Sequence, residues 1–119
     1  MYIKEASELS GATQRAIRLY ESLGLLIVSR SGKYRVYSET NIDLIKIIKE
    51  AQTLGIKLSE IVSLKDGNED FDWAVVGDFL IEKQQDVESQ IRQLEIQREK
   101  IQQYRQSIDM CLKRVDSDL

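Results

Sequence analysis

Short runs of apolar residues fill the first part of the chain, and their spacing predicts several short elements. Apolar residues at intervals of three predict a helix over residues 3–9. The stretch TQRAIRLYESLGLL predicts a second helix over residues 14–23, because Thr13 is a favourable N-cap and Gly24 suits the left-handed position that ends a helix. The SGA sequence between the two helices predicts a tight turn, so this part of the chain is a candidate helix-turn-helix.

The second predicted helix has two different faces. Ile17, Tyr20 and Leu23 share one face, which is typical of a core contact. Arg15 and Arg18 lie one turn apart on the other face. The second helix of a helix-turn-helix usually enters the major groove of DNA, where arginine bonds guanine or a phosphate. The alternative for both arginines is a solvated helix face without a ligand.

A hairpin is predicted after the second helix. The segments LLIVSR and KYRVYS are rich in β-branched and aromatic residues, and they flank Ser31 and Gly32, which mark the bend. A two-stranded hairpin is too small to be stable alone, so we expect it to pack on the helices as a wing. Ser38 then caps a predicted helix over about 39–53, and a short helix is expected over about 58–65.

One repeating pattern covers the rest of the chain. Apolar residues recur every seven positions, and the segment from Trp73 to about Arg114 contains no Pro and one Gly. This spacing predicts a single amphipathic helix with a coiled-coil seam, about 60 Å long at 1.5 Å per residue. No turn signal lets this helix fold back on itself, so we expect a second chain to bury the seam. The seam consists of Leu80, Val87, Leu94, Ile101, Ile108 and Val115 in one row, with Ile91 and Leu112 in the neighbouring row.

These elements predict a mainly α fold, in which a winged helix-turn-helix DNA-binding domain over residues 1–65 precedes a long dimerisation helix over 73–119. A charged linker over 66–72 is expected between them. Charge changes at the same place, because residues 1–65 hold ten Lys or Arg and seven Asp or Glu, whereas residues 66–119 hold seven and thirteen. The basic excess favours DNA as the partner of the first domain, and the acidic helix is expected to lie away from the duplex.

The rare residue types narrow the possible functions. The chain has no His, and Cys111 is its only Cys. A soft-metal site needs at least two such ligands, so we expect no metal. The sequence also shows no glycine-rich phosphate loop and no nucleophile–base pair, so we expect no cofactor and no enzymatic site. A redox role for Cys111 is the alternative to a small apolar residue near the helix end. The first residues lack the apolar core of a signal peptide, and the longest apolar run, LGLLIV, is too short to span a membrane, which favours a cytoplasmic protein.

Three segments carry a family resemblance, and they are IKEASELSGATQRAIRLYESLGLL, GKYRVYSE and LIKIIKEAQTLGIKLSEI. In this order and spacing they resemble the MerR family of bacterial transcription regulators. The likeness covers the first 65 residues almost without gaps, and the long helix resembles the dimerisation element of that family. The resemblance implies a homodimer on an antiparallel coiled coil. It also implies binding to a pseudo-palindromic promoter, distortion of the DNA between the half-sites, and RNA polymerase as a partner on the same promoter.

The resemblance also assigns residues to the DNA. Tyr34 and Arg35 match wing positions that contact the backbone beside a half-site, while Arg30 and Lys33 are candidates for further phosphate contacts. Tyr20 either donates its hydroxyl to a phosphate or packs under the hairpin, and both alternatives stay open. The expected DNA-binding residues are Thr13, Arg15, Arg18, Tyr20, Arg30, Lys33, Tyr34, Arg35 and Lys57.

The chain departs from the family pattern in a few places. Leu19 replaces the first of two aromatic residues, and the hairpin is shorter than usual. Lys57 stands where the family has a serine that caps the fourth helix, and its side chain has no oxygen for that bond, so it is instead a candidate phosphate contact.

An aromatic patch is predicted at the start of the long helix, formed by Phe71, Trp73, Val76 and Phe79. It either docks on the DNA-binding domain of the partner subunit or forms one wall of an apolar effector pocket. Two other functions remain open for the whole chain. One is a coiled-coil module that binds protein partners, and the other is an architectural, excisionase-like protein that bends DNA.

Overall fold

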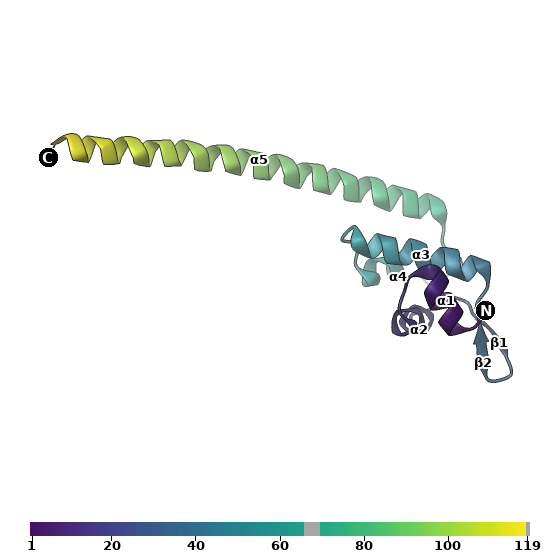
Figure 1. Ribbon diagram of the computed structural model, residues 1–119. Coiled ribbons are helices and arrows are strands. Elements are labelled where there is room, and N and C mark those ends of the chain that lie inside the picture. Colours follow the sequence, from purple (N-terminus) through teal and green to yellow (C-terminus); the bar gives the residue numbers. More distant parts are fainter. Residues whose placement is uncertain (66–69, 119) are drawn as a thin grey trace. The chain divides into compact units, whose positions relative to one another are not determined.

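The elements follow one another as short helices, a hairpin, two further helices and one long helix (Figure 1). The computed structural model describes residues 1–65 and 70–118. Its elements are α1 (Ile3–Ser10), α2 (Gln14–Ser22), β1 (Ser29–Ser31), β2 (Tyr34–Val36), α3 (Glu39–Thr53), α4 (Leu58–Lys65) and α5 (Trp73–Asp118). The mainly α winged helix-turn-helix with a long helix after it is therefore confirmed. Residues 66–69 of the expected linker lie outside the described residues, and the chain divides into two units, Met1–Trp73 and Ala74–Leu119.

Two side-chain caps start the helices that frame the hairpin. The Oγ1 atom of Thr13 accepts a hydrogen bond from the backbone N–H of Ala16 at 3.0 Å, as expected for the N-cap of α2. Ser38 accepts from the N–H of Asn41 at 3.1 Å, and the Oδ1 atom of Asn41 accepts from the N–H of Ser38 at 3.0 Å. This reciprocal pair is a capping box in which Asn replaces the usual Glu or Gln.

Two glycines end α2 and α3 in the same way. Gly24 has φ +77° and Gly55 has φ +85°, values in the left-handed region that favours glycine. The N–H of Gly24 donates to the carbonyl of Glu21, and the N–H of the next residue, Leu25, donates to the carbonyl of Tyr20. The same two bonds recur at Gly55, so both helices end in a Schellman motif.

The apolar faces of the short helices share one core in the first unit. α1 contacts both α2 and α3, and α3 contributes a row of three isoleucines. Burial of one such side chain contributes about 1.5–3 kcal/mol. Two lysines tie the turns to this core, since the Nζ atom of Lys49 donates to the carbonyl of Gly11 and that of Lys65 to the carbonyl of Gly24, each at 2.6 Å. The buried apolar residues are Ala6, Ala12, Ile17, Tyr20, Leu25, Leu26, Tyr37, Ile42, Ile45, Ile48, Ile56 and Ile61.

The hairpin is shorter than its sequence predicts, and its bend lies one residue later. β1 and β2 have three residues each, and Ser31 pairs with Tyr34, so Gly32 and Lys33 form the turn instead of Ser31 and Gly32. Leu25 and Leu26 have strand-like composition but are buried in the core. The amide of Asn41 also donates to the carbonyl of Ile27 at 3.1 Å. These tertiary contacts hold the LLIV segment outside the strand ladder.

The long helix α5 is continuous over 46 residues, as the seven-residue repeat predicts. The apolar residues of the predicted seam are exposed along it in the isolated chain. In the part of the chain that the structure describes, no helix is long and apolar enough to cross a membrane.

Replacement of Gly55 tests whether backbone angle alone selects this residue. A Cβ atom added at Gly55 meets nothing within 4 Å, so any cost comes from φ +85° and not from a clash. We expect Gly55→Ala to lower the free energy of unfolding by about 1–2 kcal/mol. Gly55→Asn should cost less, because Asn tolerates the left-handed region better. Urea denaturation at one protein concentration, followed by the fluorescence of Trp73, measures both. Equal losses for the two variants would contradict a backbone origin.

Candidate nucleic-acid interface

The exposed face of α2 carries two arginines without protein partners. Arg15 and Arg18 are both exposed, and neither makes a hydrogen bond or ion pair with another described residue. Ile17 and Tyr20 occupy the opposite, buried face, as the sequence predicts, but Leu23, predicted on the same face, is 40% exposed at the end of the helix. Two free guanidinium groups on the solvent face of the second helix of a helix-turn-helix match the arrangement that bonds guanine or phosphate in a major groove.

The hairpin adds further basic and aromatic side chains. Arg30 and Lys33 are exposed, and the Cα atom of Arg30 pairs with that of Arg35 across the ladder. The Nζ atom of Lys33 lies 5.6 Å from the centroid of the Tyr34 ring. That ring also packs edge to face against Tyr2, with the centroids 5.8 Å apart. The exposed hydroxyl end of Tyr34 can donate to a phosphate while its ring is held by these contacts.

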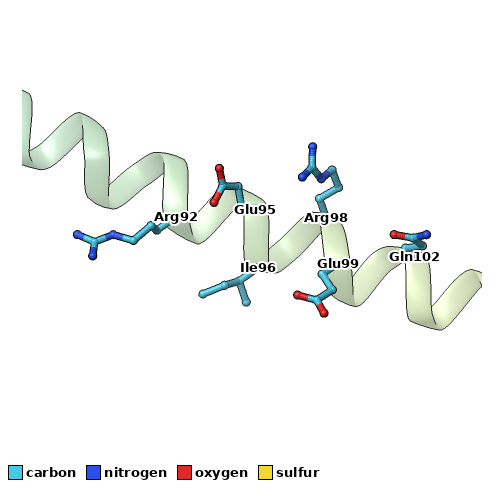
Figure 2. Close-up of a pocket in the computed structure, with 6 residues that line it drawn as sticks. All are labelled: Arg92, Glu95, Ile96, Arg98, Glu99 and Gln102. Carbon is cyan, nitrogen blue, oxygen red and sulfur yellow. The ribbon is translucent and has the colours of Figure 1, made fainter.

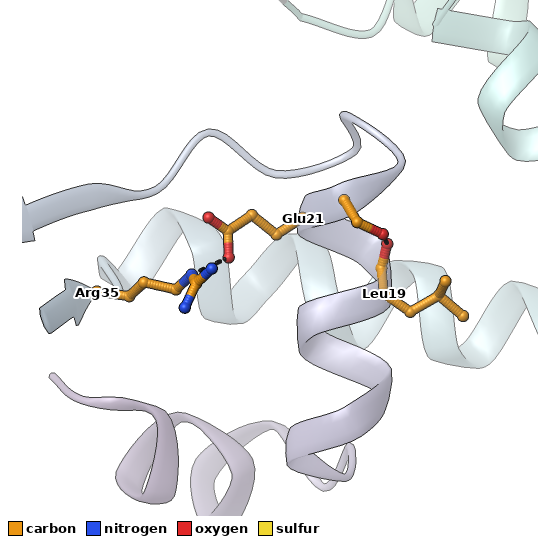
Figure 3. Close-up of polar contacts among 4 residues, drawn as sticks. Leu19, Glu21 and Arg35 are labelled. Carbon is orange, nitrogen blue, oxygen red and sulfur yellow. Dashed lines mark hydrogen bonds and ion pairs between the residues drawn. The ribbon is translucent and has the colours of Figure 1, made fainter. Parts of the chain in front are cut away.

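One ion pair joins α2 to the hairpin (Figure 3). The Nε atom of Arg35 lies 2.6 Å from the Oε2 atom of Glu21, and the figure shows the two side chains extending toward each other from β2 and α2. Both atoms are buried, and neither makes a hydrogen bond to a described residue, so the contact is a close ion pair. The Arg35 side chain as a whole is 39% exposed. No sequence pattern predicted this pair, because the helical period of α2 says nothing about a partner fourteen residues away.

A buried phenol lies in the field of the same charges. Tyr37 is 1% exposed, and its hydroxyl has no hydrogen-bond partner among the described residues. Burial raises the pKa of Tyr37, and the Glu21 carboxylate raises it further, while Arg35, Arg18 and Arg30 oppose the rise. The charges of α2 and the hairpin that act on Tyr37 are thus three arginines and one carboxylate.

Tyr20 belongs to the core and not to the exposed surface. It is 3% exposed, its hydroxyl donates to the Oε1 atom of Gln52 in α3 at 2.6 Å, and burial raises its pKa. Of the two alternatives for Tyr20, the structure places the ring in packing. The partner is α3, however, and not the underside of the hairpin. We therefore remove Tyr20 from the candidate DNA surface.

Lys57 is exposed at the start of α4, where the family pattern has a capping serine. Its backbone N–H donates to the Oε1 atom of Glu60 at 3.1 Å, and the N–H of Glu60 donates to the Lys57 carbonyl at 3.0 Å. The carboxylate of Glu60 thus satisfies a free N–H at the helix start from inside the helix. The KLSE spacing contained this signal, and it leaves the Lys57 side chain available for a phosphate.

The aromatic patch is divided between the two units. In the first unit, Phe71 and Trp73 lie 5.6 Å apart between ring centroids and line an open groove of about 450 Å³ beside α3. The Nζ atom of Lys65 lies 5.8 Å from the Phe71 ring. Val76 and Phe79 are half-buried residues of α5, in the second unit. The groove is lined by Thr40, Asp43, Leu44, Ile47, Asp70, Phe71 and Trp73.

The long helix carries a shallow hollow that no other element lines. Figure 2 shows six of its side chains, from Arg92 to Gln102, pointing in different directions from one helix. Cys111 is a free, exposed thiol. Within the described residues, no three His, Cys, Asp or Glu side chains stand close enough to hold a metal ion together.

Comparison with known protein families shows the family to which the chain belongs. The chain matches the MerR HTH family regulatory protein over residues 1–67 and the MerR, DNA binding family over residues 42–104. The chain belongs to the MerR family. MerR proteins are DNA-binding transcription regulators and not enzymes.

Individual MerR relatives agree over most of the chain. The HTH-type transcriptional regulator HmrR of Rhizobium leguminosarum bv. viciae is 35% identical over 97 residues, which cover 79% of this chain and 75% of the relative. The mercuric resistance operon regulatory protein of Bacillus cereus is 38% identical over 97 residues, covering 77% and 73%. The match to HmrR of Sinorhizobium medicae covers only 45% of that protein, so this chain spans about half the length of some MerR relatives.

A solved MerR-type structure has the same fold. The transcription regulator PbrR691 from Ralstonia metallidurans CH34, crystallised in complex with lead(II), superposes with a TM-score of 0.50 at 23% identity. The superposition covers 80% of this chain and 79% of that chain, so the likeness includes the long helix as well as the winged domain.

The buried position of Tyr20 leads to a prediction that separates packing from DNA contact. Tyr20→Phe removes the bond to Gln52 and should lower the free energy of unfolding by about 1 kcal/mol. Affinity for duplex DNA should stay within about twofold. Arg18→Ala should do the reverse, because Arg18 is exposed and has no protein partner. Urea denaturation and fluorescence anisotropy with a labelled duplex measure the two quantities, and a Tyr20→Phe protein of normal stability with weakened DNA binding would restore Tyr20 to the surface.

Proposed function

We propose that the protein binds a pseudo-palindromic promoter as a homodimer and distorts the DNA between the half-sites to control transcription. The observation that carries the proposal is the pair Arg15 and Arg18, which are exposed on α2 of a MerR-type winged domain and pair with none of the described residues. In this proposal α2 enters the major groove. Arg15 and Arg18 then bond base edges or nearby phosphates, which gives the protein its sequence preference.

The remaining basic side chains fix the position of the domain on the duplex. Phosphate contacts carry no sequence information, but they supply much of the affinity and make it dependent on salt. The proposed phosphate contacts are Arg30, Lys33, Tyr34 and Arg35 in the hairpin and Lys57 at the start of α4, and Thr13 lies exposed at the start of α2.

Dimer formation is proposed through α5. The seven-residue row is exposed along a helix of 46 residues, and an isolated helix in water gains nothing from such a row unless a second surface covers it. A second copy offers the same row and therefore a matching surface. An antiparallel arrangement, as the family resemblance implies, sets a winged domain at each end of the coiled coil. The proposed interface consists of Leu80, Val87, Ile91, Leu94, Ile101, Ile108 and Leu112.

The family resemblance extends the proposal to RNA polymerase as a partner on the same promoter. It also favours the cytoplasm as the location, because a promoter-bound regulator acts where the bacterial chromosome is transcribed. Several relatives are connected with metals by name, among them one with mercuric resistance and one with lead(II). We propose no metal effector for this chain. A soft-metal site requires at least two thiolate or imidazole ligands, and this sequence offers one Cys and no His.

The exposed row on α5 also suits a different protein as partner, which keeps a coiled-coil docking module as the second candidate function. That function predicts association that changes little with salt and no preference for an inverted repeat. The third candidate function is an architectural DNA bender. Such a protein binds and bends DNA but does not change transcription in vitro.

Selection from random duplex DNA tests the proposed function directly. We expect the purified protein, at moderate salt, to enrich one inverted repeat, and its half-site spacing to reflect the separation of the two winged domains. Arg15→Ala and Arg18→Ala should relax the preference at particular base pairs, whereas Lys33→Ala should weaken binding to all sequences alike. A well-folded dimer that enriches no repeat would contradict the regulator and favour the docking module.

The dimer interface is tested by a matched pair of substitutions on α5. Ile91 lies in the row and is 49% exposed, and Ile96 lies outside both rows and is 54% exposed. Ile91→Asp should convert the dimer to a monomer at micromolar concentration, because a charge cannot be buried in the seam without a large cost. Ile96→Asp should leave the dimer intact. Sedimentation equilibrium measures both, and the same behaviour in both variants would contradict this interface.

A further inference from the structure

The ion pair between Glu21 and Arg35 is the one described side-chain ion pair between α2 and the hairpin. Glu21 lies on the last turn of α2, and Arg35 is the central residue of β2. The paired atoms Nε and Oε2 are both buried, whereas the Arg35 side chain is 39% exposed. The exposed part of Arg35 therefore lies on atoms other than Nε.

The guanidinium of Arg35 has five N–H donors in a planar fork, and Glu21 contacts it at Nε. The contact is a close ion pair and not a hydrogen bond, because neither Nε nor Oε2 has a hydrogen-bond partner among the described residues. An ion pair of 2.6 Å between two buried atoms restrains the position of the guanidinium group. Glu21 thus restrains where the remaining donors of Arg35 lie relative to α2.

The hairpin needs such a constraint. Its strands have three residues each, and a two-stranded ribbon of this length is at best marginally stable in water. Asn41 holds the chain before β1 through the Ile27 carbonyl, and Tyr37 anchors the chain after β2 in the core. Neither contact fixes a side chain at the middle of β2.

We propose that Glu21 is a positioning residue for DNA binding, which holds Arg35 by its Nε atom so that the other guanidinium donors face a DNA phosphate at a fixed distance from the arginines of α2. The inference rests on the proposed DNA-binding function and adds a residue that the expected DNA-binding set did not include. The Glu21 carboxylate lies among the basic side chains and positions one of them, Arg35.

Simple charge counting makes the opposite prediction for the affinity for DNA after removal of Glu21. Glu21 is the carboxylate that raises the pKa of Tyr37, and its effect is opposed by Arg18, Arg30 and Arg35. Removal of a negative charge from a DNA-binding surface ordinarily strengthens binding, because it lowers the repulsion of phosphates. If Glu21 positions Arg35, its removal weakens binding instead.

The test compares Glu21→Gln and Glu21→Ala with the native chain on a duplex of arbitrary fixed sequence, because a phosphate contact needs no particular sequence. Fluorescence anisotropy over a series of KCl concentrations gives affinity and salt slope. We expect Glu21→Gln to weaken binding about threefold and Glu21→Ala about tenfold, since Gln loses the charge but keeps the size of the side chain beside Nε, whereas Ala loses both. The slope of log affinity against log salt should fall in magnitude by about 0.9, the value of one phosphate contact.

Glu50→Gln is the matched control, because Glu50 is an exposed carboxylate of α3 in the same unit. It should leave affinity unchanged or slightly raised. A double-mutant cycle with Arg35→Ala tests the mechanism. In the Arg35→Ala background, Glu21→Ala should cause no further loss, because the group that Glu21 orients is absent.

Each outcome is decisive. A native chain that fails to bind duplex DNA overturns the proposed function itself. If the native chain binds and the Glu21 variants bind equally well or more tightly, the positioning role is wrong. A loss that persists in the Arg35→Ala background also overturns it. The NMR contact between the Cα protons of Arg30 and Arg35 reports the hairpin register, and its disappearance in the Glu21 variants would show a purely structural role instead.

Discussion

The packing of α1 against both α2 and α3 is the interaction on which the proposed DNA-facing surface depends. A helix of nine residues such as α2 is unstable alone in water, so its exposed arginines have fixed positions only because its other face is buried. The hydroxyl of Tyr20 strengthens this packing through Gln52, and Lys65 secures the end of α2 through the Gly24 carbonyl. The hairpin depends on the same core, because Tyr37 anchors the chain that leaves β2.

Local signals in the sequence were sufficient for the helices. Thr13 and Ser38 accept the bonds expected of N-caps, and the glycines after α2 and α3 have the left-handed angles that favour glycine. Caps and helix-ending glycines act within four residues, so a linear pattern contains their whole interaction. The seven-residue repeat is local in the same sense, and α5 runs without a break where it predicts. The exposed positions of Arg15 and Arg18 followed from the helical period of α2.

Features that depend on residues far apart in the sequence could not be predicted from local patterns. The LLIV segment has strand composition, but the core takes Leu25 and Leu26 and the amide of Asn41 takes the Ile27 carbonyl, so the hairpin is shorter than predicted. Tyr20 had two possible environments on one helix face, and only the position of α3 distinguishes them. Glu21 and Arg35 are separated by two turns and a strand, and no period connects them. The surface was thus predictable as a set of exposed charges, but its internal constraint was not.

The division into two units has a consequence for how the proposed dimer responds to concentration. The winged unit has its own core, whereas α5 is a single helix whose apolar row is buried by a second copy in the proposed dimer. By mass action, dilution separates the copies before the winged units unfold. A separated copy places one domain on one half-site, while the dimer places two and gains from effective concentration. Occupancy of a two-half-site promoter therefore rises more steeply than in proportion to protein concentration, which gives the regulator a threshold in its own abundance.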